Sequence, residues 1–250
     1  MHVGDDGWMV EDAAGFPALT RVPSVRSGTL AADLKGPLGI VWHWTGGHCA
    51  ATVYAQALAE EIRTYNKLTD RAASWHFLIA KNGRVIQSIQ TNRGSWHVGR
   101  PGRIGGAPTL LDGKWDAVAG WGGRLFANIN AATIGVELEN SGRLEKVGER
   151  FYRWPFWLDP DKRDSGPDPR METPAARAVL QGGAWYDEFP QAQEMAATRL
   201  LQACAVKFGW AREVCRYGHL MFDPSRREDP GALWLDVVLP RILDRVYGAK

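Results

Sequence analysis

Several features are scarce or absent in this 250-residue chain, and each excludes a class of protein. Only three cysteines are present, an odd and low number that argues against a disulfide framework and fits a reducing compartment. No run of about 18 apolar residues occurs, so we expect no transmembrane helix and no membrane insertion. The net charge of +2 is too small to indicate a nucleic-acid partner.

The N-terminal segment lacks the marks of a secretory signal peptide. It carries the adjacent acids Asp5 and Asp6, and it has neither a basic region nor an apolar one. We therefore expect a cytoplasmic protein, which could act outside the cell only after its release. The sequence leaves the oligomeric state open.

The composition is that of an ordinary globular protein, with 45% hydrophobic and 23% charged residues. The length suits one large domain with appendages. Residues 1–35 lack clear periodicity, and we interpret them as an N-terminal arm. Residues 36–250 form the expected main domain. Within it, the polar, proline-rich segment at about 141–188 is interpreted as an inserted excursion, with a hairpin near 144–156.

Strand and helix patterns alternate along the domain. An Asn-Gly pair at Asn82 and Gly83 predicts a tight hairpin turn. Pro240 is expected to kink or split the last helix. The predicted strands are 38–42, 76–79, 85–89 and 134–139, and the predicted helices are 53–62, 190–208 and 232–247. Together these predict an α/β fold with a mixed central β-sheet flanked by helices.

Two histidines and one aspartate occupy positions that suit a metal site. His43 ends an apolar strand, His219 follows a glycine, and Asp229 lies in an Asp-Pro-Gly sequence. Zinc takes imidazole and carboxylate ligands, and a catalytic zinc keeps three protein ligands and an open position. Spacing alone is weak evidence, because a strand-end histidine is commonly a structural residue.

Four sequence blocks resemble, in the same order, a family of zinc-dependent N-acetylmuramoyl-L-alanine amidases. This family includes phage amidase-type lysozymes, muropeptide-recycling amidases and peptidoglycan-recognition proteins. The blocks are 40–45, 75–99, 134–139 and 218–231. The resemblance implies a peptidoglycan-recognition-protein-like fold, a Zn²⁺ cofactor, and hydrolysis of the amide bond between muramic acid and L-alanine.

Carried over by position, the resemblance implies His43, His219 and Asp229 as zinc ligands and Glu137 as the acidic catalytic residue. A lysine of the family corresponds to Arg227, which is also cationic but differs in geometry. Some phage members have a catalytic tyrosine where this chain has Trp75, and they lack the glutamate found here. The chain therefore resembles the branch that uses a glutamate.

Residues near the second block are candidates for substrate binding, namely His97, Trp96 and Arg100. His97 and His76 match family positions and are either structural or substrate-lining. Arg100 is a candidate for binding stem-peptide carboxylates, and the alternative is a solvated surface charge.

Other polar residues lie close in sequence to the candidate ligands. His48 and Cys49 follow His43 and either reach the metal or serve as a loop histidine and a buried thiol. Glu139 shares a strand face with Glu137. It is either a supporting group for the site or a solvated residue.

The expected substrate is peptidoglycan or a soluble muropeptide, with neither nucleic acid nor membrane as a partner. The arm and the excursion exceed a minimal catalytic domain, which favours a phage-type endolysin. The alternatives are a cytoplasmic recycling amidase that acts on anhydro-muropeptides and a non-catalytic peptidoglycan-binding module of the same fold.

Overall fold

The computed structural model describes residues 1–11, 19–24, 27–30, 34–45, 74–98, 129–153, 172–222 and 228–249. The predicted helix at 53–62 lies outside these residues, as do His48, Cys49, Arg100 and Arg227. Among the described residues, no helix combines the length and apolar character needed to cross a bilayer.

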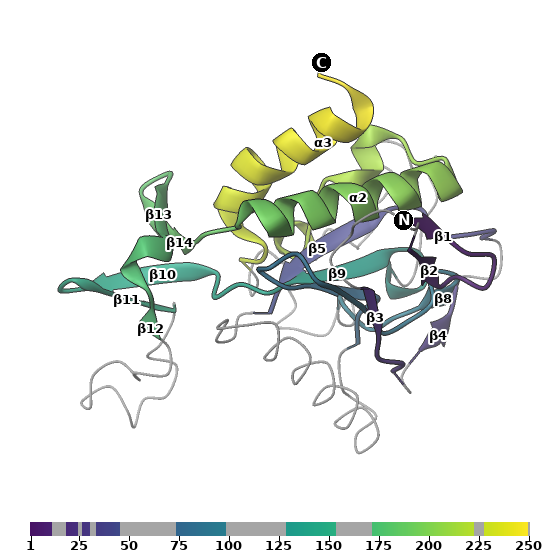
Figure 1. Cartoon of the computed structure of the whole chain (residues 1–250), viewed down its shortest axis with the longest axis horizontal. Helices are drawn as coiled ribbons and strands as arrows, with labels where there is room; N and C mark the ends of the chain where they lie inside the picture. Colours follow the sequence, from purple (N-terminus) through teal and green to yellow (C-terminus); the bar gives the residue numbers. More distant parts are fainter. Residues whose placement is uncertain are drawn as a thin grey trace, which may run out of the picture.

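A six-stranded mixed sheet forms the centre of the molecule (Figure 1). Its strand order is β15-β5-β9-β6-β7-β3, and every neighbouring pair is parallel except the antiparallel pair β6–β7. This confirms the prediction of a mixed central sheet flanked by helices. The strands are β3 (Leu19–Arg21), β5 (Ile40–Trp44), β6 (Phe77–Ile79), β7 (Val85–Gln87), β9 (Ile134–Leu138) and β15 (Tyr217–Gly218).

The turn between β6 and β7 forms as the Asn-Gly pair predicts. Gly83 has φ +84°, which a residue without a Cβ adopts easily. Its backbone also lies close to α2, because a Cβ at this position would lie 2.6 Å from the Ala192 carbonyl oxygen. The turn therefore sets the hairpin register and allows close packing of a helix.

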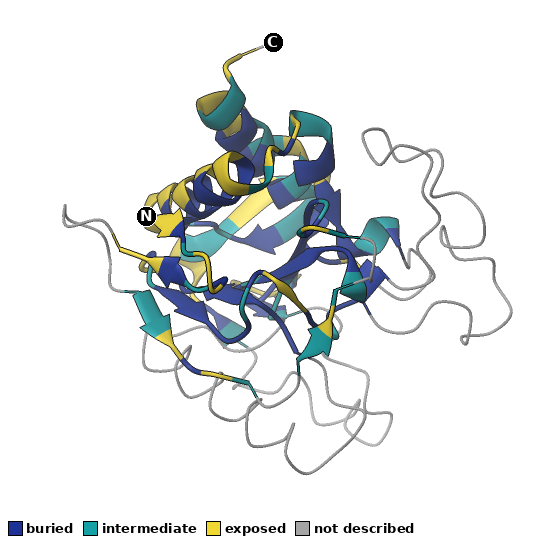
Figure 2. Cartoon of the chain, turned by 90° about the vertical axis from the view of Figure 1, so that its right-hand side faces the viewer, coloured by how far each residue is buried: buried dark blue, intermediate teal, exposed yellow. Residues whose placement is uncertain are grey.

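Two helices cover one face of the sheet (Figure 1). The longer helix, α2 (Gln191–Phe208), begins after Pro190 and ends at Gly209, which has the left-handed φ of +65°. Ala196, Leu200 and Cys204 are buried on the face toward the sheet, whereas Ala192 in the first turn is exposed. The core between helices and sheet is continuous, as the buried strands in Figure 2 show.

The last helix changes its geometry just before Pro240, without being interrupted there. A π-helical segment, η8 (Leu233–Val238), passes directly into α3 (Leu239–Tyr247). Proline has no backbone N–H and cannot make the i→i−4 hydrogen bond, so a wider turn before it is physically reasonable. The segment still packs well, because Trp234 is fully buried against Trp42 and Phe189.

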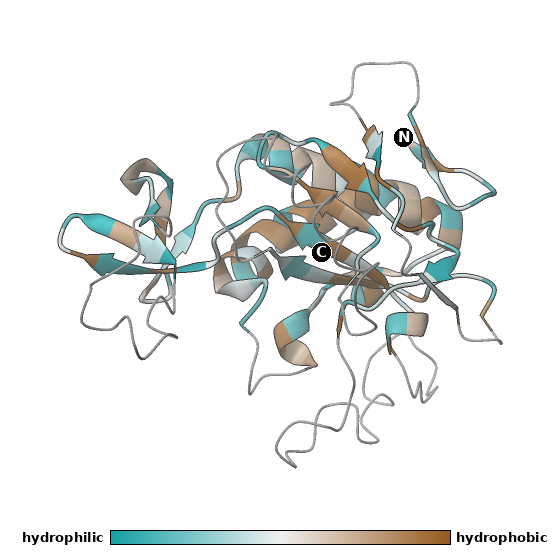
Figure 3. Cartoon of the chain, turned by 90° about the horizontal axis from the view of Figure 1, so that it is seen from below, coloured by the Kyte–Doolittle hydropathy of each residue, from teal (hydrophilic) through white to brown (hydrophobic). Residues whose placement is uncertain are grey.

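A second, five-stranded antiparallel sheet is inserted between β9 and α2, and it extends to one side of the main sheet (Figure 1). The predicted hairpin near 144–156 is present as β10 and β11. Its strands carry both hydrophilic and hydrophobic residues (Figure 3). The strands are β10 (Arg143–Val147), β11 (Arg150–Arg153), β12 (Glu172–Thr173), β13 (Ala178–Gln181) and β14 (Ala184–Asp187).

The inserted sheet is anchored to the main sheet through the buried carboxylate of Asp187. Arg177 donates hydrogen bonds to both Asp187 oxygens, Ser141 donates its backbone N–H, and the Lys81 ammonium lies 3.2 Å away. A fully buried carboxylate needs such partners to replace the hydration it has lost. This cluster therefore fixes the inserted sheet relative to the β6–β7 turn.

Part of the N-terminal arm joins the fold through short strands. The Gln87 side chain accepts a hydrogen bond from the Met9 N–H and donates one to the Gly7 carbonyl. Two strands of the arm pair with strands of the main domain, β3 with β7 and β4 with β8. The remaining short strands are β1 (His2–Val3), β2 (Met9–Val10), β4 (Gly28–Thr29) and β8 (Arg93–Gly94).

Candidate active site

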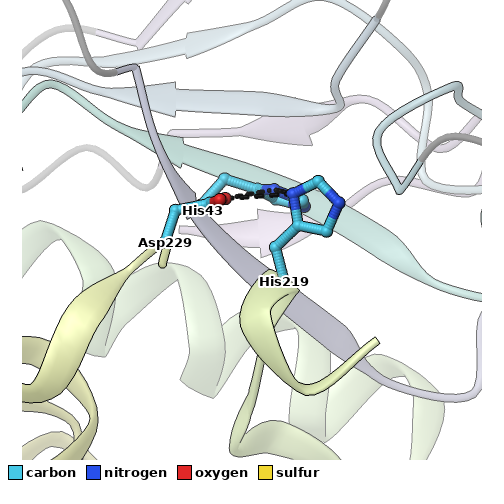
Figure 4. Close-up of side chains that lie close together, drawn as sticks. All are labelled: His43, His219 and Asp229. Carbon is cyan, nitrogen blue, oxygen red and sulfur yellow. Dashed lines mark hydrogen bonds and ion pairs between the residues drawn. The ribbon is translucent and has the colours of Figure 1, made fainter. Parts of the chain in front are cut away.

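His43, His219 and Asp229 converge at one point, and we call them the donor cluster (Figure 4). His43 comes from β5, His219 follows β15, and Asp229 precedes the final helix. The two Nδ1 atoms are 3.1 Å apart, and Asp229 Oδ2 lies 3.0 Å from one and 3.1 Å from the other. Residues 186 positions apart in sequence are thus brought together.

The spacing of these three atoms fits a zinc ion. With bonds of about 2.0–2.2 Å, the donor atoms of a tetrahedral zinc site lie about 3.3 Å apart. The observed separations of 3.0–3.1 Å are close to that value. All three side chains are buried, so the donors are held in place by packing. Among the described residues, this is the group of histidine, cysteine and acidic side chains arranged to hold a metal.

The hydrogen-bonding chemistry of the cluster also fits a cation. His219 Nε2 lies 3.3 Å from the Val98 carbonyl oxygen, to which it donates its N–H. A neutral imidazole carries one N–H, so the lone pair of His219 is on Nδ1 and is directed at His43 and Asp229. A nitrogen lone pair and a carboxylate oxygen repel each other at this distance, and a cation bound between them would remove the repulsion.

The Asp229 carboxylate is held in its ionised form. Burial by itself raises the pKa of this carboxyl, but the adjacent imidazoles of His219 and His43 outweigh it and hold the pKa well below its usual range. An anionic oxygen beside two imidazoles is the donor set expected for a hydrolytic zinc site.

Glu137 lies beside the donor cluster on the same face of the sheet. It is the register partner of His43 on the neighbouring parallel strand β9, so both side chains leave the sheet in the same direction. Its side chain is half-buried. A carboxylate next to a metal site and partly open to solvent is well placed to exchange protons with water and substrate.

His97 and His76 lie beneath the site as buried imidazoles. His97 Nδ1 lies 3.0 Å from His43 Nε2, and its Nε2 lies 3.2 Å from Thr133 Oγ1. His76 donates Nε2–H to the Arg93 carbonyl and accepts hydrogen bonds from Ser95 and the Gly135 N–H. With all ring nitrogens engaged inside the protein, the structure favours the structural interpretation over a substrate-lining one.

Burial favours the neutral form of both imidazoles. It is the main reason that the pKa of His97 lies well below its ordinary value, and the neighbouring His43 lowers it further. Burial likewise lowers the pKa of His76 to about 4. Gly135 makes room for this arrangement, because a Cβ there would lie 2.4 Å from His97 Cγ.

Glu139 is buried and is not a solvated residue. Its Oε2 accepts a hydrogen bond from the Lys81 N–H, and burial raises its pKa. Trp96 is partly exposed beside the site residues, with its backbone N–H bonded to Ser74 Oγ. Its role in substrate binding stays a prediction.

The inserted sheet lies against the loop that carries Asp229. Arg143 at the start of β10 forms an ion pair with Glu228 at 3.4 Å. The Trp44 ring packs over Gly142 and Gly231, where a Cβ would approach it to 2.6 Å. Sequence patterns do not reveal this contact, because the spacing of the residues involved shows no recognisable motif.

Residues 33–232 match the family model described as N-acetylmuramoyl-L-alanine amidase. The chain belongs to this family. The match spans the donor cluster, Glu137 and the inserted sheet, and it confirms the resemblance drawn from the four sequence blocks. The protein is therefore an N-acetylmuramoyl-L-alanine amidase, as predicted.

Solved structures similar to this amidase share little sequence with it. An AmpD derivative is 18% identical over 95% of this chain and 97% of its own, with a TM-score of 0.49. AmiD from E. coli was solved in complex with anhydro-N-acetylmuramic acid-L-Ala-D-gamma-Glu-L-Lys. It is 17% identical over 96% of this chain and 65% of its own, with a TM-score of 0.46.

PlyL is 14% identical over 93% of this chain and 99% of its own, with a TM-score of 0.47. No curated protein matches the chain. Because the TM-scores lie below 0.5, the assignment rests on the family model.

Proposed function

We propose that this amidase is zinc-dependent and that His43, His219 and Asp229 hold the ion. The observation that carries the proposal is the convergence of two Nδ1 atoms and one carboxylate oxygen, each 3.0–3.1 Å from the others. When bound, zinc supplies a Lewis acid that lowers the pKa of water to about 7 and polarises a carbonyl group.

In this proposal Glu137 moves protons between water and the leaving amine. Its place beside His43 lets one carboxylate accept a proton from the attacking water and return it to the nitrogen of the broken amide bond. Arg227, which the resemblance aligns with a family lysine, would stabilise the negative charge that develops on the carbonyl oxygen. Trp96, Arg100 and His97 are the substrate-binding candidates, of which His97 is better explained as a support for His43.

We further propose that the substrate is polymeric peptidoglycan, as for a phage-type endolysin. The inserted sheet supports this, because it extends the surface next to the Asp229 loop through Arg143 and Glu228. A long polymer can contact such a surface, whereas a small soluble muropeptide fills little beyond the cleavage site. Under this proposal the protein is made in the cytoplasm and acts on the wall after release.

The test is product analysis by mass spectrometry with two substrates, purified peptidoglycan and soluble anhydro-muropeptide. The expected result is release of peptides with a free L-alanine amine from intact glycan strands, with the polymer cleaved faster. Faster cleavage of the soluble substrate would instead identify a recycling amidase.

Binding of the polymer without cleavage by the zinc-loaded protein would identify a non-catalytic module. A chelator-treated sample is the control, because a zinc-dependent enzyme loses cleavage there and recovers it when zinc is added.

A further inference from the structure

The two ring nitrogens of His43 face different partners. Nδ1 is directed at His219 and Asp229, at 3.1 and 3.0 Å. On the other side of the ring, Nε2 lies 3.0 Å from His97 Nδ1. A neutral imidazole carries its proton on one nitrogen only, so the state of His97 decides which nitrogen of His43 keeps a lone pair.

The proton positions on His97 follow from a series of hydrogen bonds that starts at the Ile129 backbone carbonyl. Thr133 donates its single hydroxyl proton to the Ile129 carbonyl oxygen at 2.9 Å. Its Oγ1 therefore acts as the acceptor in the 3.2 Å contact with His97 Nε2. His97 then carries its proton on Nε2, and its Nδ1 accepts the proton of His43 Nε2–H.

The segment that contains His97 is clamped by one side chain. The backbone N–H groups of His97 and Val98 both donate to Asn130 Oδ1, each at 2.8 Å. The Val98 carbonyl in turn accepts the Nε2–H of His219. Two adjacent residues thus contact the far nitrogens of both histidines in the donor cluster.

We propose that His97 is a positioning residue for the metal centre. The series of hydrogen bonds that runs from the Ile129 carbonyl through Thr133 to His97 fixes His43 in its Nε2–H tautomer. His43 Nδ1 then presents a lone pair to the ion, while Asn130 holds His97 and Val98 in register with His43 and His219. This inference rests on the proposed zinc site. Groups of this kind raise metal affinity because they fix the tautomer and orientation of a ligand ring.

The first test compares two substitutions of His97 in the full chain. His97→Leu removes the acceptor for His43, whereas His97→Asn places an amide oxygen near the position of Nδ1. Zinc affinity is measured by competition with a chromophoric chelator. We expect His97→Leu to weaken zinc binding about 10- to 100-fold and His97→Asn to recover much of the loss. Thr198→Val is the matched control, because it removes a buried hydroxyl that donates to the Glu194 carbonyl within α2, and its zinc affinity should equal that of the wild type.

The second test needs no substitution. Nitrogen-15 NMR of the wild-type imidazoles distinguishes protonated from unprotonated ring nitrogens. We expect the protons of His43 and His97 to reside on Nε2. A proton on His97 Nδ1, or unchanged zinc affinity in His97→Leu, would overturn the inference.

A His43→Ala variant separates this failure from failure of the proposed function. If His43→Ala loses zinc and His97→Leu does not, only the role of His97 is wrong. If His43→Ala binds zinc as tightly as the wild type, the metal site itself is wrong.

Discussion

Glu137 and His43 are register partners on the adjacent parallel strands β9 and β5. Their side chains therefore leave the sheet on the same face, next to each other. The backbone pairing of two central strands, rather than a flexible loop, sets the distance between the candidate proton carrier and the candidate metal ligand. Sites built on strands hold their geometry better than sites built on loops.

Glu137→Gln removes the carboxylate and preserves the shape of the side chain. We expect kcat/KM for amide cleavage to fall by about 10²–10⁴-fold, because the proton transfer loses its carrier. Zinc content, measured by atomic emission on the same sample, should not change. Glu139→Gln is a matched control, since its oxygen can still accept the Lys81 N–H bond, and it should retain activity within a few-fold. Full turnover by zinc-loaded Glu137→Gln would remove this residue from the mechanism.

Removal of the metal should lower thermal stability. A ligand at about 100 times its dissociation constant stabilises the folded state by about 3 kcal/mol. For a chain of this size, chelation should thus lower Tm by roughly 5–10 °C, and zinc should restore it. Calorimetry of wild type and Asp229→Ala, each with and without zinc, tests this. The variant should show no zinc-dependent shift, and an undiminished shift would exclude Asp229 as a ligand.

The Gly135→Ala substitution should displace His97, which contacts the candidate ligand His43. The new Cβ would lie 2.4 Å from His97 Cγ, so His97 or the strand must move. Overpacking of this kind costs about 1–3 kcal/mol in the free energy of unfolding, and we expect weaker zinc binding as well. Gly28→Ala is the control, because its Cβ would meet no heavy atom closer than 3.8 Å. Urea unfolding and chelator competition measure the two effects, and equal results for the two variants would contradict the prediction.

The stability of the metal-free protein should fall as the pH is lowered from about 6.5 to about 4. Burial lowers the pKa of His76 to about 4, against about 6.5 for the unfolded chain. Between these values the unfolded state binds the proton more readily, so stability rises with pH there and is fully present above about 6.5.

The contribution of His76 is about 3 kcal/mol across this window. The free energy of unfolding, measured in urea at several pH values with a chelator present, should show a shallower pH dependence in His76→Gln. Parallel curves for the two proteins would show that His76 does not titrate in this way.

The sequence by itself determined the elements of the main sheet and the identity of the donor cluster. The apolar run before His43, the Asn-Gly turn, and the strand at 134–139 are local signals, since they depend on periodicity and turn chemistry within a few residues. The four sequence blocks, through their resemblance to the family, indicated which residues are the donors. The structure brings the same three side chains together.

Only the tertiary structure decided how these groups are supported. The sequence predicts an inserted proline-rich excursion with one hairpin, and the structure shows a five-stranded sheet anchored by Asp187 and Arg177. Its strands are short and its partners distant in sequence, so local patterns carry little information about it. The same holds for Asn130 and Thr133, whose contacts with residues 97 and 98 arise only when residues 129–133, just before β9, pack beside the segment after β8. Hydrogen bonds between residues more than 30 positions apart are a product of chain folding, and no spacing rule in the sequence encodes them.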